Sequence, residues 1–489
     1  MGCSLLTVAS MLLVALALGG AAIRRFWNTI TPHQDEVRGV TLTSVGSSVA
    51  AGLLANAALV LCGLSLKAVL LATAALAMWS LWRHRAERWR VRAVDHGRAT
   101  LAAAALASML LVGFALWGLA EPLMHTDAVN IWFFHARMIW LAGRLTGAGW
   151  NHASIAFSNP DYPTLVPALA AQLATAGSRW NLYFPKLALS LALAPAYCWL
   201  SGLCVDGVLE RRCGGAFLFV SCLFGLPDEW LTNGYMDGVL ALYAGLCAWW
   251  AGRWLETRRP ADAEAAVLAA GLCLSMKNEG ALVVASIGLA VAIAAWWLGP
   301  MSIPSTATTV SWDGQAFHRW RPLSVVVLAV TPLVLWSGRK RIHGVGSALV
   351  ARGGWSLPQF TAQWLDHSQR STLLAAFAID DSIWVLVALV IVSLVILRAW
   401  RRSASVVVLV SALAAMMYAV GMFVVFLGLT YDIRFYLSTA AERVLTVPRI
   451  LLLVSLAGIL DASAVADAQA LSSARRNHKV APHSSASSS

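Results

Sequence analysis

The sequence carries little charge for its length. Only 12% of its 489 residues are Asp, Glu, Lys or Arg, and 59% are hydrophobic. Soluble proteins carry about a quarter charged residues, so this composition excludes an ordinary soluble enzyme. Cysteine motifs are also missing. The eight cysteines lie mostly inside apolar runs without CxxC or Cys/His spacing, which excludes a disulfide framework and a cysteine-based metal site.

Long apolar runs take the place of the missing charge. Runs of about 20 residues, the length that crosses a bilayer, recur along the whole chain, and the mean hydropathy is +0.69. We therefore predict an all-α polytopic membrane protein with about 13 transmembrane helices and juxtamembrane helices on its outer surface. The predicted spans are 4–23, 41–63, 68–82, 100–119, 183–206, 213–227, 235–251, 264–280, 281–298, 322–337, 379–398, 404–427 and 447–462. The first lacks a basic leading segment and is followed by further spans, which indicates a retained helix and not a signal peptide.

The basic residues set the predicted orientation. A formal net charge of +12 would indicate nucleic acid in a soluble domain, but here the arginines crowd short segments between spans, so no nucleic-acid partner is expected. If these segments are cytoplasmic, the N-terminus lies outside and the C-terminus inside. Parity then makes 163–178 a juxtamembrane helix, and 463–489 a disordered cytoplasmic tail. The basic segments are 24–27, 83–98, 253–259 and 398–402.

Several ionisable clusters have no role in this orientation, and all of them fall on the outer side. Charged groups at membrane depth are costly and usually functional. We therefore predict one outward-facing polar site assembled from separate segments of the chain. The segments contain Asp127, Asp161, "PDEWLTNGYMDG" at 227–238, "KNEG" at 277–280 and "YDIRFYLSTAAERV" at 431–444.

Each carboxylate also has a simpler interpretation. Asp127 precedes aromatic residues typical of a helix at the membrane interface. Asp161 lies between two prolines, where an Asx turn is the alternative, and Asp237 starts a span, where helix capping is the alternative. Asp161 and Asp237 together also suit a divalent cation, because hard cations take oxygen ligands and keep water or phosphate as the rest.

Lys277 and Glu279 interrupt a long apolar stretch. Residues two apart do not face each other on a helix, so we do not expect an internal salt bridge between them. The alternatives are a lysine that extends to the membrane surface and a glutamate that caps the next helix. The loop 338–378 carries five basic residues on the outer side, and we expect these to meet anions. They are Arg339, Lys340, Arg341, Arg352 and Arg370.

Five motifs follow one another along the chain: "DAVNIWFFHAR", "NPDYP", "GYMDG", "KNEG" and "DIRFYLSTAAER". In this order, they resemble the motifs of the GT-C superfamily of polyprenyl-phosphate-sugar glycosyltransferases, specifically bacterial proteins of the family 39 kind. These are similar to aminoarabinose transferases of lipid A and to protein O-mannosyltransferases. The resemblance covers roughly residues 100–462, leaving 1–99 as an N-terminal extension. Asn159 stands in place of a histidine and His135 in place of a lysine, and residues 434–436 depart from Glu-Trp-His.

The resemblance implies a multi-pass protein of the bacterial inner membrane with a periplasmic active site. It implies an undecaprenyl-phosphate-linked sugar donor, a glycan, lipid or protein acceptor, and inverting transfer. Asp127 takes the place of the catalytic acidic residue, and Asp161 and Asp237 suit a divalent metal or the donor phosphate. The substrate-binding residues would be His135, Arg137, Tyr162, Lys277, Glu279, Asp432 and Arg443.

Two other functional classes compete with the glycosyltransferase. A transporter or flippase would use the same charges as a path, but it predicts inverted repeats and broken helices at the membrane midplane, which the sequence does not show. A GT-C scaffold that has lost activity is the second rival, because several motifs are substituted. The chemistry of inverting transfer suits the residues independently, since it needs a base for the acceptor proton and cations for the departing phosphate.

Overall fold

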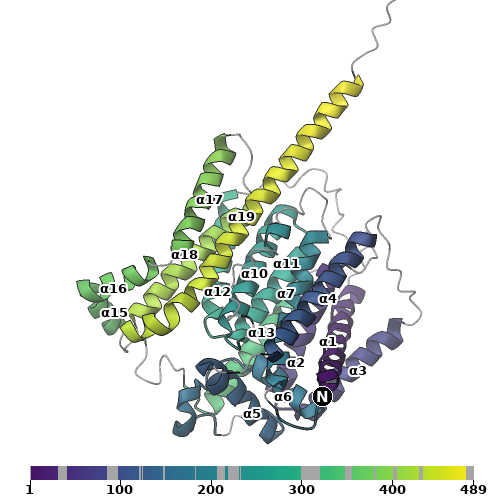
Figure 1. Cartoon of the computed structure of the whole chain (residues 1–489), viewed down its shortest axis with the longest axis vertical. Helices are drawn as coiled ribbons and strands as arrows, with labels where there is room; N and C mark the ends of the chain where they lie inside the picture. Colours follow the sequence, from purple (N-terminus) through teal and green to yellow (C-terminus); the bar gives the residue numbers. More distant parts are fainter. Residues whose placement is uncertain are drawn as a thin grey trace, which may run out of the picture.

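The computed structural model is helical wherever it has regular structure, which confirms the all-α prediction for the described residues. Its long helices lie side by side in a bundle (Figure 1). The short helices α5 (Phe133–Ala142) and α6 (Leu165–Ala176) lie at one end, and α15 (Leu357–Leu365) and α16 (His367–Ala378) project to one side. The structure describes residues 2–30, 41–84, 97–120, 123, 125–146, 149–181, 183–205, 215–218, 231, 233–298, 320–346, 355–378, 381–399, 405–428 and 433–480.

The long helices follow the apolar runs of the sequence. Each one in the described part of the chain overlaps a predicted span, and the remaining predicted span, 213–227, lies mostly outside the described residues. The long helices are α1 (Gly2–Ile30), α2 (Leu42–Leu61), α3 (Leu66–His84), α4 (Gly97–Ala120), α7 (Phe184–Val205), α10 (Asp237–Thr257), α11 (Pro260–Met276), α12 (Gly280–Leu298), α13 (Trp320–Ile342), α17 (Asp381–Ala399), α18 (Val406–Leu427) and α19 (Ile433–Val480).

Membrane-spanning character is clearest in part of this set. Among the described residues, 6 helices contain a stretch that is both long and apolar enough to cross a membrane. The chain is therefore a multi-pass membrane protein, while the count of about 13 spans is not confirmed. The six stretches are Leu42–Leu61, Lys186–Cys204, Gly280–Trp297, Leu323–Ile342, Val406–Leu427 and Ala440–Asp461.

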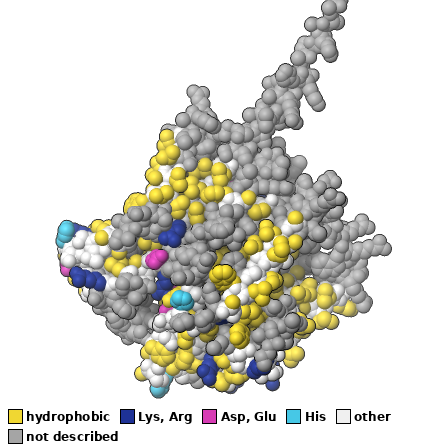
Figure 2. Space-filling model, viewed as in Figure 1, with side chains coloured by type: hydrophobic (Ala, Val, Ile, Leu, Met, Phe, Trp, Pro, Cys, Tyr) yellow, Lys and Arg dark blue, Asp and Glu magenta, His cyan; other side chains and the backbone are white. Residues whose placement is uncertain are grey.

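Large apolar side chains remain exposed on the outside of the bundle. Trp296 of α12 and Ile391 of α17 are examples, and they suit a surface that faces lipid. On the face shown in Figure 2, the coloured charged side chains lie at the level of α15 and α16 and below it, while hydrophobic surface extends both above that level and below it. The described charges on this face therefore gather toward one end of the bundle.

The N-terminal helices share the core of the rest of the chain. Leu16 of α1 and Leu53 of α2 belong to the same buried cluster as Trp199 of α7 and Tyr243 of α10. α2 also contacts α11 and α13. The segment 1–99 lies outside the family resemblance, but its described helices are packed as part of one bundle.

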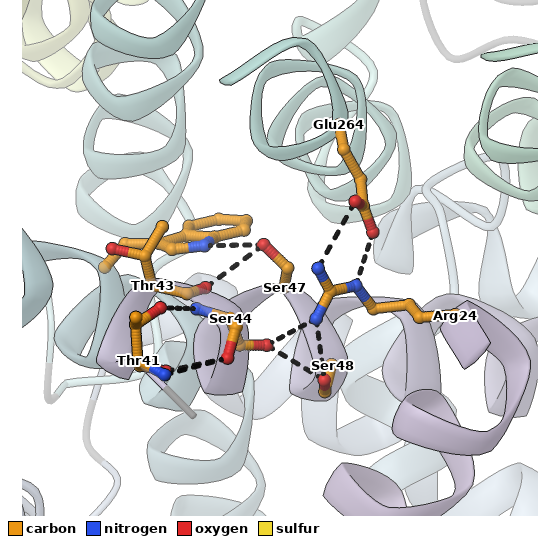
Figure 3. Close-up of polar contacts among 8 residues, drawn as sticks. Arg24, Thr41, Thr43, Ser44, Ser47, Ser48 and Glu264 are labelled. Carbon is orange, nitrogen blue, oxygen red and sulfur yellow. Dashed lines mark hydrogen bonds and ion pairs between the residues drawn. The ribbon is translucent and has the colours of Figure 1, made fainter. Parts of the chain in front are cut away.

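A polar cluster fastens α1 and α2 to α11 (Figure 3). The Arg24 guanidinium forms a two-pronged ion pair with the Glu264 carboxylate, whose side chain is 4% exposed. The same guanidinium donates to the Ser44 carbonyl at 2.7 Å and to Ser48 Oγ at 3.0 Å. A buried ion pair is tolerated when further hydrogen bonds satisfy its remaining atoms, as they do here.

The ends of the bundle differ in chemistry. Arg24 lies at the end where α1 finishes and α11 begins, together with the turn at 258–259 between α10 and α11. The opposite end, which we call the α5 end, holds α5, α6 and the turn at 277–279 between α11 and α12. α6 has 12 residues, about 18 Å of helix, too short to cross a hydrocarbon core of about 30 Å. α19 continues as a helix to Val480, past the boundary at 462 where the tail was expected to begin.

Candidate functional site

Arg443 joins two of the predicted acidic residues at the α5 end. Its Nη1 lies 2.5 Å from Asp127 Oδ2 and 4.0 Å from Asp237 Oδ2. These residues come from the start of the α5 segment, from α19 and from the first turn of α10. The side chains of Arg443 and Asp127 are 18% and 25% exposed, so this pair lies at the rim of the cluster. One guanidinium thereby links segments that are more than 300 positions apart in the sequence.

Lys277 lies beneath that rim and joins two more carboxylates. Its Nζ is 2.7 Å from Asp237 Oδ1 and 3.1 Å from Glu279 Oε1. Burial alone would lower the pKa of the Lys277 ammonium, but the charges of Asp237 and Glu279 outweigh burial and raise it well above its usual value. The two carboxylates therefore favour the charged form of the buried Lys277 ammonium.

The Lys277–Glu279 contact corrects an expectation from the sequence. We expected no salt bridge between residues two apart, because such residues diverge on a helix. α11 ends at Met276, and Lys277 is extended, with φ −152° and ψ 156°. The two side chains meet because 277–279 is a turn between helices. The lysine does not extend to the membrane surface either, since it is 5% exposed.

Asp161 enters the cluster through Asn278. Its Oδ2 accepts a hydrogen bond of 2.7 Å from Asn278 Nδ2, and its backbone carbonyl accepts one of 2.9 Å from Trp336 Nε1. No described backbone amide donates to the Asp161 carboxylate, so the Asx turn that the sequence offered as an alternative is not formed. The turn is made by the backbone instead, where the Tyr162 amide donates to the Asn159 carbonyl. Asn159 has φ 48°, a left-handed conformation that asparagine adopts more readily than most residues.

The helix starts use neither Asp127 nor Asp237 as a side-chain cap. Asp127 precedes a π-helical turn, Ala128–Trp132, and makes no capping hydrogen bond. Asp237 is the first residue of α10, after Met236 in the cap position. Their carboxylates point instead to Arg443 and Lys277. The capping interpretation therefore fails for Asp237, and the interfacial interpretation does not account for the ion pair of Asp127.

Two motif glycines hold these segments together. Gly234 of "GYMDG" has φ 93°, and a Cβ there would lie 2.6 Å from the Cβ of Ala128, next to Asp127. Gly280 of "KNEG" packs so tightly that a Cβ would collide with the Cys273 carbonyl at the end of α11. Only glycine fits either position without movement of the backbone. The motifs thus specify close approach between segments as well as side-chain chemistry.

Aromatic side chains surround the charges, and sequence reasoning missed most of them. Arg443 lies over the ring of Tyr235, 4.7 Å from its centroid, and Tyr235 in turn contacts His125. Tyr162, which was predicted, stacks on Trp132 with centroids 5.3 Å apart and planes 5° apart. Tyr162 is close enough to Glu279 and Asp161 for their charges to add to burial in raising the pKa of its phenol. Asn278 and Trp336 were also missed, although Asn278 stands inside the quoted "KNEG" motif.

Two predicted site residues, His135 and Arg137, do not join the cluster, and a third was not placed. His135 is fully buried beside Trp150, with Nε2 3.1 Å from Ser158 Oγ, and burial lowers the pKa of its imidazole to about 3. Arg137 is exposed on α5. Asp432 lies outside the described residues. The cluster therefore consists of Asp127, Asp161, Tyr162, Asp237, Lys277, Glu279 and Arg443, with Asn278 and Tyr235 added by the structure.

Three carboxylate oxygens in the cluster are buried and have no hydrogen-bond partner among the described residues. They are Asp161 Oδ1, Asp237 Oδ2 and Glu279 Oε2. Among the described residues of the cluster, four carboxylates face two cations, so the negative charge is only partly balanced. Hard oxygens of this kind fit a divalent cation. The described residues nevertheless contain no group of three or more His, Cys, Asp or Glu side chains placed to hold one, so a cation here needs further ligands from water or substrate.

The basic residues of the loop 338–378 separate into different environments. Arg339 donates to the carbonyls of Leu61 and Leu145, so it meets backbone carbonyls and not anions. Arg370 donates to the Trp364 carbonyl at 2.9 Å and lies over the Trp364 ring. The expectation that these cations meet anions is wrong for both residues. Arg352 lies outside the described residues.

Comparisons with protein-family models, with curated protein sequences and with solved structures gave no match for this chain.

Proposed function

We propose that this protein is an integral membrane glycosyltransferase that moves a sugar from a polyprenyl-phosphate donor to an acceptor, with inversion at the anomeric carbon. The observation that supports it most is the convergence of all the motif segments with described residues on one charged cluster. Asp127, Asp161, Asp237, Lys277 and Arg443 come from separate parts of the chain and are joined by direct contacts or through Asn278.

The cluster offers both chemical roles that inverting transfer needs. Asp127 is at the rim, and only its Oδ2 is engaged by Arg443 among the described residues, so its carboxylate is placed to take the acceptor proton. The acceptor oxygen then forms the new bond to the anomeric carbon. The bond from that carbon to the phosphate oxygen breaks, and its electron pair leaves with the polyprenyl phosphate.

The cations would stabilise the leaving phosphate. Arg443 and Lys277 lie at the rim and beneath it, and charge-assisted contacts from such groups are strong when water is largely excluded. A divalent cation held by Asp161 and Asp237 would neutralise further charge on that phosphate. Tyr235 and Tyr162 supply flat faces beside the charges, which suit contact with a sugar ring.

The orientation belongs to the same proposal. The basic segments at 24–27 and 253–259 lie at the opposite end of the bundle from the cluster. If basic segments face the cytoplasm, the cluster faces the other side of the membrane, which in a bacterial inner membrane is the periplasm.

The proposal is tested by measuring whether the protein releases free polyprenyl phosphate, the lipid carrier of the donor sugar. Purified protein in nanodiscs is incubated with undecaprenyl-phosphate-linked sugars and candidate acceptors, and free polyprenyl phosphate is measured along with the glycosylated product. We expect both products in equal amounts. A transporter would move the donor across vesicles without releasing carrier, and that outcome would remove the enzyme proposal.

A further inference from the structure

A second cationic feature lies near the candidate site and takes no part in it. The last turn of α13 and the residues after it line a hollow of about 480 Å³, open to the surface. This volume is within the range of about 300–1,000 Å³ typical of small-molecule sites. Its lining consists of Ser337, Lys340, Arg341, Gly344, Val345 and Gly346.

The three consecutive basic residues of this turn, 339–341, lie in different environments. Arg339 turns inward to the Leu61 and Leu145 carbonyls. Lys340 and Arg341 line the hollow, and neither side chain forms a salt bridge or a hydrogen bond with the described residues. Lys340 feels the charge of Asp161, but the two groups are not within salt-bridge distance. Two cations facing one hollow without a bound carboxylate repel each other, so an anion there lowers their energy.

The surrounding structure makes this hollow a fixed feature. Trp336, one turn before Lys340, is buried, donates to the Asp161 carbonyl and packs edge-on against Trp150. The Val345 amide donates to the Lys340 carbonyl at 2.9 Å, which closes the turn after the helix. The residues that carry the charges are therefore held by the same contacts that hold Asp161.

We propose that this hollow, which we call the α13 pocket, is an anion site that binds a phosphate group through Lys340 and Arg341, with Ser337 Oγ as an additional donor. Arg341 offers the fork of N–H groups that matches phosphate oxygens, and Lys340 supplies a compact charge. None of the residues that line the pocket belongs to the Lys277–Arg443 cluster, although the charge of Asp161 acts on Lys340. The phosphate belongs either to an anionic lipid headgroup or to a soluble phosphate compound.

Two binding measurements distinguish these sources. Native mass spectrometry of the purified protein measures retention of phosphatidylglycerol against phosphatidylcholine. Equilibrium dialysis of the protein in phosphatidylcholine nanodiscs measures binding of labelled inorganic diphosphate at constant ionic strength. We expect one of the two probes to bind, and Lys340→Gln and Arg341→Gln each to weaken that binding roughly tenfold, since each removes a charge-assisted contact.

Two controls keep the result specific. Arg370→Gln removes one cation from α16, away from the pocket lining, and should leave binding unchanged. Lys340→Arg keeps the charge and should restore binding, which separates loss of charge from loss of folding. The proposal is overturned if neither probe binds the wild-type protein, or if the pocket variants bind as tightly as Arg370→Gln.

Discussion

Lys277 and Asp237 form a buried ion pair, in which each charge is stabilised by the other. Each side chain is 6% exposed or less. Glu279 is the next charge, 3.1 Å from Lys277, and Arg443 lies 4.0 Å from the second oxygen of Asp237. Removing one partner of a buried pair leaves an uncompensated charge, which typically costs about 3–5 kcal/mol. The pair therefore contributes to folding as well as to any binding.

We predict that Lys277→Met lowers the thermal stability of the detergent-purified protein by several kcal/mol. Asp237→Asn combined with Lys277→Met should recover part of that loss, because the second change removes the more deeply buried of the two carboxylates that Lys277 pairs with. Thermal unfolding of the wild type, both single variants and the double variant forms the cycle. Additive losses in the double variant would show that the two side chains do not act as an ionic pair.

His135 makes the fold sensitive to acid. Its pKa in the folded protein is about 3, against an ordinary value of 6.5, so the unfolded chain binds the proton first as the pH falls. The stability that depends on a neutral His135 is complete above pH 6.5 and is lost between about 6.5 and 3. At pH 5 the loss is about 2 kcal/mol.

His135→Phe should therefore lose less stability than the wild type between pH 7 and pH 5, by about 2 kcal/mol. Thermal unfolding at the two pH values measures this difference. His367→Asn, on the exposed start of α16, should retain the wild-type pH dependence. Equal pH dependence in the wild type and His135→Phe would mean that His135 is protonated in the fold.

At the scale of the elements, short irregular segments bring the charges together. These segments are the π-helical turn at Ala128–Trp132, the turn at 277–279 and the segment before α10. A regular helix in their place would direct the charged side chains away from the cluster. Gly234 joins the first and third of these segments through its contact with Ala128.

Gly234→Ala should displace the segment that carries Asp127 and reduce sugar transfer by at least tenfold. The matched control is Gly143→Ala. Gly143 also has a positive φ, 65°, but nothing lies within 4 Å of a Cβ there. Both changes cost about 1–2 kcal/mol in backbone strain, and only the first adds a collision. Equal transfer rates for the two folded variants would mean that the Gly234 contact does not position Asp127.

The sequence predicted the elements unevenly, for physical reasons. Apolar runs predicted the long helices well, because a helix of about 20 residues that is buried or in contact with lipid must consist mostly of apolar residues. α15 and α16 lie in the segment 338–378 that the sequence predicts to be a loop, because their polar residues break up any apolar run. The motifs predicted which acidic residues gather, but spacing alone did not reveal that Asn278 and Tyr235 join them or that His135 faces Trp150.

At the scale of the whole molecule, the two polar ends of the bundle define its orientation. Cysteine labelling in a variant without native cysteines tests the orientation, because Cys62 is exposed at the α5 end and would react itself. Ser158, which precedes the "NPDYP" motif, is unsuitable as a probe because it is buried against His135. Ala153, in the same segment, and Ala261, at the start of α11, are exposed.

We predict that Ala153→Cys reacts with a membrane-impermeant maleimide in intact cells, whereas Ala261→Cys reacts only after the membrane is permeabilised. The reason is that Ala261 lies beside the basic turn at 258–259, at the end opposite to the cluster. The reverse pattern would place the charged cluster in the cytoplasm and remove the periplasmic part of the proposal.

The central claim is that the cluster at the α5 end is a catalytic site, and transfer by Asp127→Asn tests it most directly. The substitution keeps the shape of the side chain and removes its basicity, and loss of a general base costs about two to four orders of magnitude in rate. The matched control is Asp366→Asn, because Asp366 is exposed and accepts from the amides of Ser368 and Gln369, a role that asparagine also fills. The account predicts that folded Asp127→Asn binds the donor but releases almost no polyprenyl phosphate, while Asp366→Asn matches the wild type. Transfer at the wild-type rate by Asp127→Asn would contradict it.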